Sequence, residues 1–202
     1  CPSGTGFCCY ATLNAMWQMW QQRYTKELCS TIVEQAKEIE PQDAIVGFQG
    51  SNVDTKVRRS KVRWITRDNK DLGWLYHELT NLFHVANHNA FGSELWHLNE
   101  IQFTEYNAED QGYYNWHNDV NWDDGRQVHR KLSLVCQLSS PEEYEGGEFE
   151  MQPLHLGSPK QEHLRTQGTV LVFPSFVVHK VNPVTKGTRH TLVAWMEVPK
   201  WR

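Results

Sequence analysis

The sequence predicts an α+β fold in which a layer of helices packs against a β-barrel or a two-sheet sandwich. Two observations lead to this prediction. Apolar residues recur with the period of a helix in residues 25–40 and 71–86. From Leu98 onward the period changes to two, with turn residues between short segments. Helices followed by about seven or eight strands are typical of the α+β class.

Each predicted helix has signals at its ends. In residues 25–40, Thr25 can cap the first turn, and Pro41 follows the last one. Residues 71–86 place leucines such as Leu79 on one face with a 3.6-residue period, and a polar Asn-His-Asn segment follows. We therefore expect two amphipathic helices ahead of most of the strands.

The predicted strands are short and follow one another to the C-terminus. They cover residues 44–49, 61–66, 99–106, 113–120, 130–138, 148–151, 169–173, 177–181 and 188–198. In residues 99–106, Ile101 and Phe103 share one face, while Gln102, Thr104 and Tyr106 share the other, as expected of a strand that packs on one side and lines a pocket on the other. Residues 182–187 are predicted to form a turn, so that 177–181 and 188–198 make a hairpin.

A single domain is expected over residues 25–202, because a chain of 202 residues is long enough for one ordinary hydrophobic core. Residues 1–24 are expected to be an irregular N-terminal segment. Residues 1–15 have no charged side chain and lack the basic start of a signal peptide. Our hypothesis is that they are not part of the natural protein and that the functional chain begins near Met16.

Composition excludes several classes of protein. The net charge of −4 argues against nucleic acid or an anionic membrane as the main partner. No run of eighteen apolar residues is present, so no transmembrane helix is expected. The five cysteines are an odd number, contain no C-x-x-C pair and predict no disulfide framework, which favours a reducing, cytoplasmic location.

Three residues form a candidate metal site. His117 and Asp119 are two positions apart, so on a strand their side chains point to the same face. Alone, such a pair is more often a hydrogen bond than a metal site. His179 stands on an otherwise apolar strand and offers a third ligand. Two imidazoles and one carboxylate form the 2-His-1-carboxylate facial triad of non-haem Fe(II), which leaves coordination positions open.

Arg189 suggests what else binds at this site. It is ten residues after His179, and it shares a strand face with Thr191, Val193 and Trp195. A buried guanidinium is costly without an anionic partner, and Glu197 is the only acidic residue nearby on that face. Its planar fork suits a carboxylate. The residues therefore suggest a bound dicarboxylate with one end on the metal and the other on Arg189.

The order of these motifs resembles the prolyl 4-hydroxylase-like branch of the Fe(II)/2-oxoglutarate dioxygenases over about residues 25–198. The resemblance is carried by residues 168–175, His179 with residues 180–184, residues 187–189 and Trp195, and by Tyr106, residues 112–113, His117-x-Asp119 and residues 146–149, with residues 59–64 upstream. The ordered set of motifs is more specific than any one of them.

This resemblance implies a double-stranded β-helix (jelly-roll) core with supporting N-terminal helices. It implies Fe(II) held by His117, Asp119 and His179, and 2-oxoglutarate bound by Arg189 and Tyr106, with the Thr191 hydroxyl completing the pocket. It also implies O2 as oxidant and ascorbate as a candidate reductant. The activity implied is hydroxylation of an unactivated C–H bond, with release of succinate and CO2. Arg59 and Trp195 are candidate substrate-pocket residues.

Several functions stay open at this point. The basic cluster that includes Arg59 is either a solvated strand edge or the border of a site for an anionic or peptide substrate. The resemblance favours a prolyl residue of a peptide or protein as substrate, and a free amino acid or other small molecule is the alternative. Nucleic-acid demethylation is disfavoured, because Trp195 stands where that branch has a second arginine. A non-catalytic jelly-roll metal-binding module and a zinc hydrolase are the remaining readings, although a hydrolase leaves Arg189 unexplained.

Overall fold

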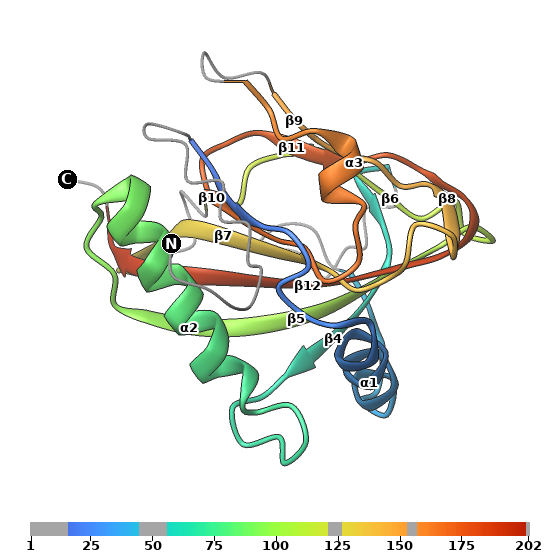
Figure 1. Cartoon of the computed structure of the whole chain (residues 1–202), viewed down its shortest axis with the longest axis horizontal. Helices are drawn as coiled ribbons and strands as arrows, with labels where there is room; N and C mark the ends of the chain where they lie inside the picture. The colour runs from blue at the N-terminus through green and yellow to red at the C-terminus, as the bar shows by residue number, and fades with distance from the viewer. Residues whose placement is uncertain (1–15, 45–55, 121–126, 153–156, 201–202) are drawn as a thin grey trace, which may run out of the picture.

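Two antiparallel sheets make up most of the computed structural model, which describes residues 16–44, 56–120, 127–152 and 157–200 (Figure 1). The large sheet has the order β1 (Gln18–Trp20), β10 (Val170–Pro174), β7 (Val128–Gln137), β12 (Val184–Pro199), β5 (His97–Asn107), β4 (Lys61–Ile65) and β2 (Gln42–Asp43), and β8 (Tyr144–Gly146) also pairs with β12. The small sheet has the order β3 (Arg58–Arg59), β6 (Tyr113–His117), β11 (His179–Val181) and β9 (Phe149–Met151).

The helices are α1 (Lys26–Lys37), α2 (Leu75–Ala86), its π-helical continuation η1 (Asn87–Phe91) and the short α3 (Gln161–Leu164). Thr25 caps α1 as predicted, because its hydroxyl accepts a hydrogen bond from the amide of Leu28 at 3.2 Å. The continuation after α2 ends at Gly92, whose φ of 59° is the left-handed conformation that glycine adopts without strain. Throughout the described ranges, every helix is too short or too polar to serve as a membrane span.

Two hydrophobic cores lie on opposite faces of the large sheet. One contains α1 and α2 residues such as Ile32 and Leu79, packed with sheet residues such as Ile101. The other lies between the sheets, where Phe173 of the large sheet meets Phe149 of the small one with ring centroids 5.9 Å apart. Figure 1 shows α1 and α2 on one side of the large sheet and β9 and β11 on the other. This arrangement of two facing antiparallel sheets fits a jelly-roll core.

The alternation predicted for residues 99–106 is confirmed. Ile101 and Phe103 are fully buried in the helix-side core, while Gln102 and Tyr106 line a cavity between the sheets. Gly146 and Gly147 both have positive φ, and they form the bend that leads into β9, as the sequence predicted.

The predicted hairpin between residues 177–181 and 188–198 is wrong. β11 pairs with β6 and β9 in the small sheet, whereas β12 begins at Val184 and pairs with β5, β7 and β8. The turn was predicted over residues 182–187. The chain instead crosses from one sheet to the other at residues 182–183, and residues 184–187 are extended strand that pairs with β8. His179 and Arg189 therefore come from opposite sheets.

Two smaller predictions also change. The strand expected over residues 113–120 ends at His117, so that Asp119 lies two residues beyond the end of β6. Residues 1–24, expected to be irregular, include β1 (Gln18–Trp20), which pairs with β10 at the edge of the large sheet. The strand expected at residues 44–49 lies outside the described residues except for Ala44, and the short β2 ends just before it at Asp43.

Candidate metal and dicarboxylate site

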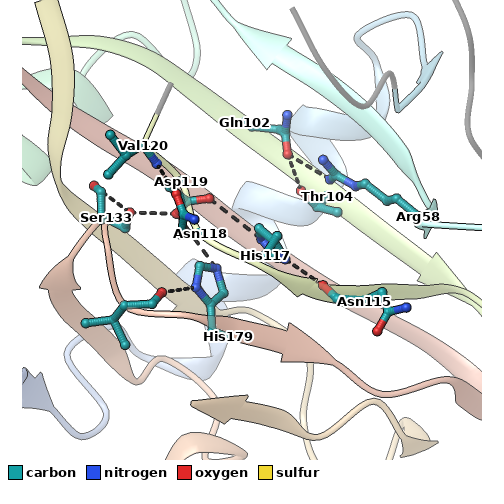
Figure 2. A network of polar contacts seen from close by, with 12 residues as sticks. Arg58, Gln102, Thr104, Asn115, His117, Asn118, Asp119, Val120, Ser133 and His179 are labelled. Atoms are coloured by element: carbon teal, nitrogen blue, oxygen red, sulfur yellow. Dashed lines mark hydrogen bonds and ion pairs between the residues drawn. The ribbon is translucent and has the colours of Figure 1, made fainter. Parts of the chain in front are cut away.

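The three predicted metal ligands meet at one end of the space between the sheets. His117 is the last residue of β6 and His179 the first of β11, and the two are direct partners in the antiparallel register. Asp119 reaches the same place from the segment that follows β6. One ligand atom from each residue lies within 4.8 Å of the others, and Figure 2 shows the three side chains converging.

Backbone carbonyls orient both imidazole rings. His117 Nδ1 lies 2.7 Å from the Asn115 oxygen, and His179 Nδ1 lies 2.9 Å from the Val177 oxygen. A carbonyl oxygen can only accept, so each Nδ1 carries the proton and each Nε2 keeps a lone pair for a metal. Each Nε2 is 3.7 Å from an oxygen of Asp119, which is beyond hydrogen-bond length. This donor set fits an Fe(II) ion.

The carboxylate of Asp119 is held by two serines. Ser133 donates to Oδ2 of Asp119 at 2.6 Å, and the Ser133 and Ser175 hydroxyls are 2.9 Å apart. The Asp119 amide donates to the Ser175 carbonyl at 2.8 Å, which fixes the backbone beyond β6. Ser133 was not predicted as a site residue, although alternation in residues 130–138 places it on the face opposite Leu132 and Leu134.

The electrostatics keep the ligands in metal-binding form. Burial and the neighbouring His179 lower the pKa of His117 to about 4. Burial alone raises the pKa of Asp119, but His179, His117 and the Ser133 hydroxyl together bring that pKa below its usual range. At neutral pH, His117 is therefore neutral and Asp119 ionised, as metal coordination requires.

A cavity of about 300 Å³ extends from these ligands to Arg189. Arg189, Thr191 and Trp195 line it from alternate positions of β12, and Tyr106 lies opposite Arg189 in the register of β5. The residues assigned to the metal and to the dicarboxylate from sequence alone thus share one cavity.

Arg189 is buried without an acidic partner. Its side chain is 3% exposed, its Nε donates to the amide oxygen of Gln137 at 3.1 Å, and its guanidinium lies 5.8 Å from the ring centroid of Tyr106. Within the described part of the chain, no carboxylate pairs with it. Glu197, the acidic residue considered from sequence, lies 3.6 Å from His97 instead. A buried cation with only neutral partners suits an anionic ligand.

The pocket assignment of Arg59 is not supported by its position. Arg59 is exposed and lies over the ring of Tyr113, whereas Arg58 lines the cavity. Adjacent strand residues point to opposite faces, and the pairing of β3 with β6 puts Arg58 opposite Tyr114 on the inner face. The sequence shows the arginine pair but not this register. The second candidate, Trp195, does line the cavity.

Other polar residues of the cavity were not predicted as site residues. Arg58 donates to Gln102 at 2.9 Å, and Gln102 also accepts from Thr104 at 3.0 Å (Figure 2). Arg130 bonds Glu100 at 3.0 Å and lies 3.9 Å from the ring centroid of Trp195. Alternation had placed Gln102 on the pocket face of its strand, whereas Arg130 reaches the cavity through a pairing between distant strands.

Comparisons with known proteins agree with this geometry. Residues 101–197 match the model of the 2OG-Fe(II) oxygenase superfamily. A PKHD-type hydroxylase of Idiomarina loihiensis is 31% identical over 110 residues, which are 54% of this chain and 48% of that protein. Another from a Synechococcus species is 37% identical over 84 residues, 42% of this chain and 36% of that protein. The chain thus spans about half, or less, of the length of these curated relatives.

Solved structures extend the similarity of fold over most of the chain. A prolyl-4-hydroxylase of Pseudomonas putida superimposes with a TM-score of 0.70 at 21% identity, covering 90% of this chain and 92% of that one. A prolyl hydroxylase of Trichoplax adhaerens, in complex with a hypoxia inducible factor peptide fragment, gives 0.71 at 15% identity, covering 89% and 82%.

The geometry thus fits a facial triad at one end of a jelly-roll core. The match to the model of the 2OG-Fe(II) oxygenase superfamily includes all three candidate ligands and Arg189, and the resemblance to the prolyl 4-hydroxylase-like branch is confirmed.

Proposed function

We propose that the chain is an Fe(II)- and 2-oxoglutarate-dependent dioxygenase that hydroxylates an unactivated C–H bond. The observation that carries the proposal is the pairing of two sites in one cavity. Three residues that fit a 2-His-1-carboxylate triad lie at one end, and a buried arginine that has no acidic partner among the described residues lies at the other. A dicarboxylate co-substrate can satisfy both ends at once.

His117, Asp119 and His179 would hold the metal, while Arg189 would bind the far carboxylate of 2-oxoglutarate beside Tyr106 and Thr191. When bound, Fe(II) with 2-oxoglutarate and O2 supplies the oxidising power for hydroxylation, with release of succinate and CO2, and ascorbate would serve as reductant. With only three protein ligands, the chain would leave coordination positions available to the co-substrate and O2, and the walls of the cavity would limit the access of water. No side chain is required as a general acid or base.

A prolyl residue of a peptide or protein is the substrate that we propose. Two structural neighbours support it, since one is named a prolyl-4-hydroxylase and the other holds a peptide fragment. Trp195 offers an apolar surface for a pyrrolidine ring, and its ring is held in place by Arg130. Trp195 is the cross-strand partner of Ser133, which bonds Asp119, so the proposed substrate surface lies toward the metal end of the cavity.

A free amino acid or other small molecule is the second candidate, and Arg58 favours it. The Arg58 residue is 7% exposed and lines the cavity, and its guanidinium donates to the neutral side chains of Ser60 and Gln102. Among the described residues it has no carboxylate partner. The carboxylate of a free amino acid would satisfy it, whereas a peptide offers a neutral carbonyl at the same place.

The test begins with the metal and the co-substrate. Adding Fe(II) and 2-oxoglutarate under anaerobic conditions should give a visible charge-transfer band, and admission of air should release succinate. Proline-containing peptides and free amino acids are then screened for a mass increase of one oxygen atom. Absence of both the band and succinate would reject the oxygenase and favour a non-catalytic metal-binding module. Oxidation of only free amino acids would replace the prolyl substrate with the small-molecule alternative.

Three further parts of the proposal concern the whole chain. We infer that residues 25–202 act as one domain together with β1, which pairs with β10, and that α1 and α2 support the large sheet, since Ile32 and Leu79 are fully buried against it. A reducing, cytoplasmic location accords with the buried free thiols of Cys29 and Cys136. Reporter fusions of the natural protein, examined by fractionation, test the location.

A further inference from the structure

Gln137 contacts the arginine at the carboxylate end of the cavity. It is the last residue of β7, it is 2% exposed, and it lies opposite Thr191 in the register of β12. Its amide oxygen accepts the hydrogen bond from Arg189 Nε at 3.1 Å. Neither the sequence motifs nor the family resemblance assigns this glutamine a role.

The orientation of the Gln137 amide is fixed by its other contacts. Its Nε2 donates to the Ser139 carbonyl at 2.9 Å and to the Tyr144 hydroxyl at 3.2 Å. Because a backbone carbonyl only accepts, the NH2 group must face Ser139, and the oxygen must face Arg189. The Gln137 amide oxygen, which accepts from Arg189 Nε, is therefore held in one orientation at the end of β7.

The aliphatic stem of Arg189 is confined as well. A Cβ atom at Gly147 would lie 3.1 Å from Cδ of Arg189 and 2.9 Å from Cγ2 of Val184, so the stem passes through space that only glycine leaves open. With the stem in this slot and Nε bonded to Gln137, the guanidinium plane is set. The terminal nitrogens have no hydrogen-bond partner in the described part of the chain, and Arg189 lines the cavity.

The neutrality of the Gln137 side chain matters as much as its geometry. A carboxylate at this position would neutralise Arg189 before any ligand arrived, whereas an amide oxygen orients Nε and leaves the full positive charge. We propose that Gln137 is a positioning residue that aims the Arg189 fork and reserves its charge for the far carboxylate of the co-substrate. This inference rests on the proposed function, because it concerns how that same site binds 2-oxoglutarate.

The test compares two ligands that differ only in the far carboxylate. Calorimetry on the Mn(II)-loaded protein measures the affinities of 2-oxoglutarate and of 2-oxobutyrate, which lacks that group. Q137M keeps the side-chain volume but removes the acceptor, and it should lower the preference for 2-oxoglutarate about tenfold, as expected for loss of one hydrogen bond to a charged group. Q137E should lower it further, because it also neutralises Arg189. Neither variant should change the affinity for 2-oxobutyrate.

Gln167 offers a matched control. It is also a buried glutamine, 8% exposed, and its Nε2 donates to the Leu138 carbonyl at 2.8 Å without contacting Arg189. Q167M should lower thermal stability and leave the ligand preference unchanged.

The alternative outcomes separate this inference from the proposed function. Loss of both ligands in equal measure in Q137M, or an unchanged preference in Q137M and Q137E, would overturn the positioning role while the oxygenase proposal stands. A wild-type protein that binds Mn(II) but does not bind 2-oxoglutarate would overturn the proposed function and this inference with it.

Discussion

Two buried arginines on opposite faces of the large sheet have opposite surroundings. Arg63 faces the helices. It is 8% exposed, bonds the Ile39 carbonyl at 2.9 Å and has the Glu105 carboxylate at 3.7 Å. Arg189 faces the cavity and is 3% exposed, and among the described residues its one hydrogen bond goes to the neutral amide of Gln137.

The difference separates a structural arginine from a ligand-binding one. A buried charge is costly unless it is paired, so the chain gives Arg63 a carboxylate of its own. Arg189 keeps an uncancelled charge beside a cavity whose other end carries three metal ligands. We expect removal of the first arginine to affect folding and removal of the second to affect binding.

The largest effect is expected at the metal end of the cavity, because the metal and Arg189 would bind the two ends of the same dicarboxylate. Asp119→Asn keeps the shape of the side chain but removes the only anionic ligand. Mn(II) affinity measured by calorimetry should fall more than about 100-fold, beyond what loss of an outer-shell partner causes. Unchanged Mn(II) affinity would show that the metal binds elsewhere.

The two arginines can be exchanged for methionine in turn. Arg189→Met should weaken 2-oxoglutarate binding to the Mn(II)-loaded protein about 100-fold, because two charge-assisted hydrogen bonds are lost, while Mn(II) affinity is spared. Thermal unfolding of the ligand-free variant should show unchanged or raised stability, since an unpaired buried charge is removed.

Arg63→Met should do the reverse. It should destabilise the protein by about 2 kcal/mol, because it leaves Glu105 without one of its partners, and leave 2-oxoglutarate affinity unchanged. If both variants lost stability equally and neither lost affinity, the contrast between the two arginines would have no functional meaning.

Ser133 tests whether the metal end depends on its hydrogen-bonded support. Ser133→Ala removes the 2.6 Å hydrogen bond to Oδ2 of Asp119 without altering a ligand. Mn(II) affinity should fall about tenfold, the usual cost of losing an outer-shell partner. Ser140, which is half-buried between β7 and β8 and bonds Glu142 and not a metal ligand, is the control, and Ser140→Ala should leave that affinity as in the wild type.

The metal end was predictable because its signals are local or belong to an ordered family motif. His117 and Asp119 are adjacent on one short segment, and the resemblance placed His179 and Arg189. Alternation along residues 99–106 correctly put Tyr106 on the pocket face. Such signals depend only on positions along one strand.

The rest of the site and of the fold depends on pairings between distant strands, which a single sequence does not reveal. Gln137 meets Arg189 because β7 pairs with β12. Arg58, in place of Arg59, points inward because of its register with β6. The predicted hairpin after His179 failed for the same reason, since a short polar segment was interpreted as a turn where the chain crosses between sheets.

The smallest effect is expected for the pH dependence of stability, through Glu105 on the helix-facing side of the large sheet. Glu105 lies 3.4 Å from His190 Nε2, and this contact, followed by the nearby charge of Arg63, keeps the pKa of Glu105 below its usual range despite burial. An acid whose pKa is lowered by folding contributes stability above the pKa it has in the unfolded chain, about 4.5, and loses that contribution as the pH falls through its folded pKa.

The free energy of unfolding in urea should therefore differ by about 1 kcal/mol between the metal-free wild type and Glu105→Gln at neutral pH. The difference should begin to shrink below about pH 4.5, where the carboxylate takes up a proton in the unfolded chain, and it should disappear below the lower folded pKa, where the carboxylate is protonated in both states. A difference that stayed constant from pH 7 to pH 3 would mean that shape, and not charge, makes Glu105 the partner of Arg63. The contrast with Arg189 would then no longer be electrostatic.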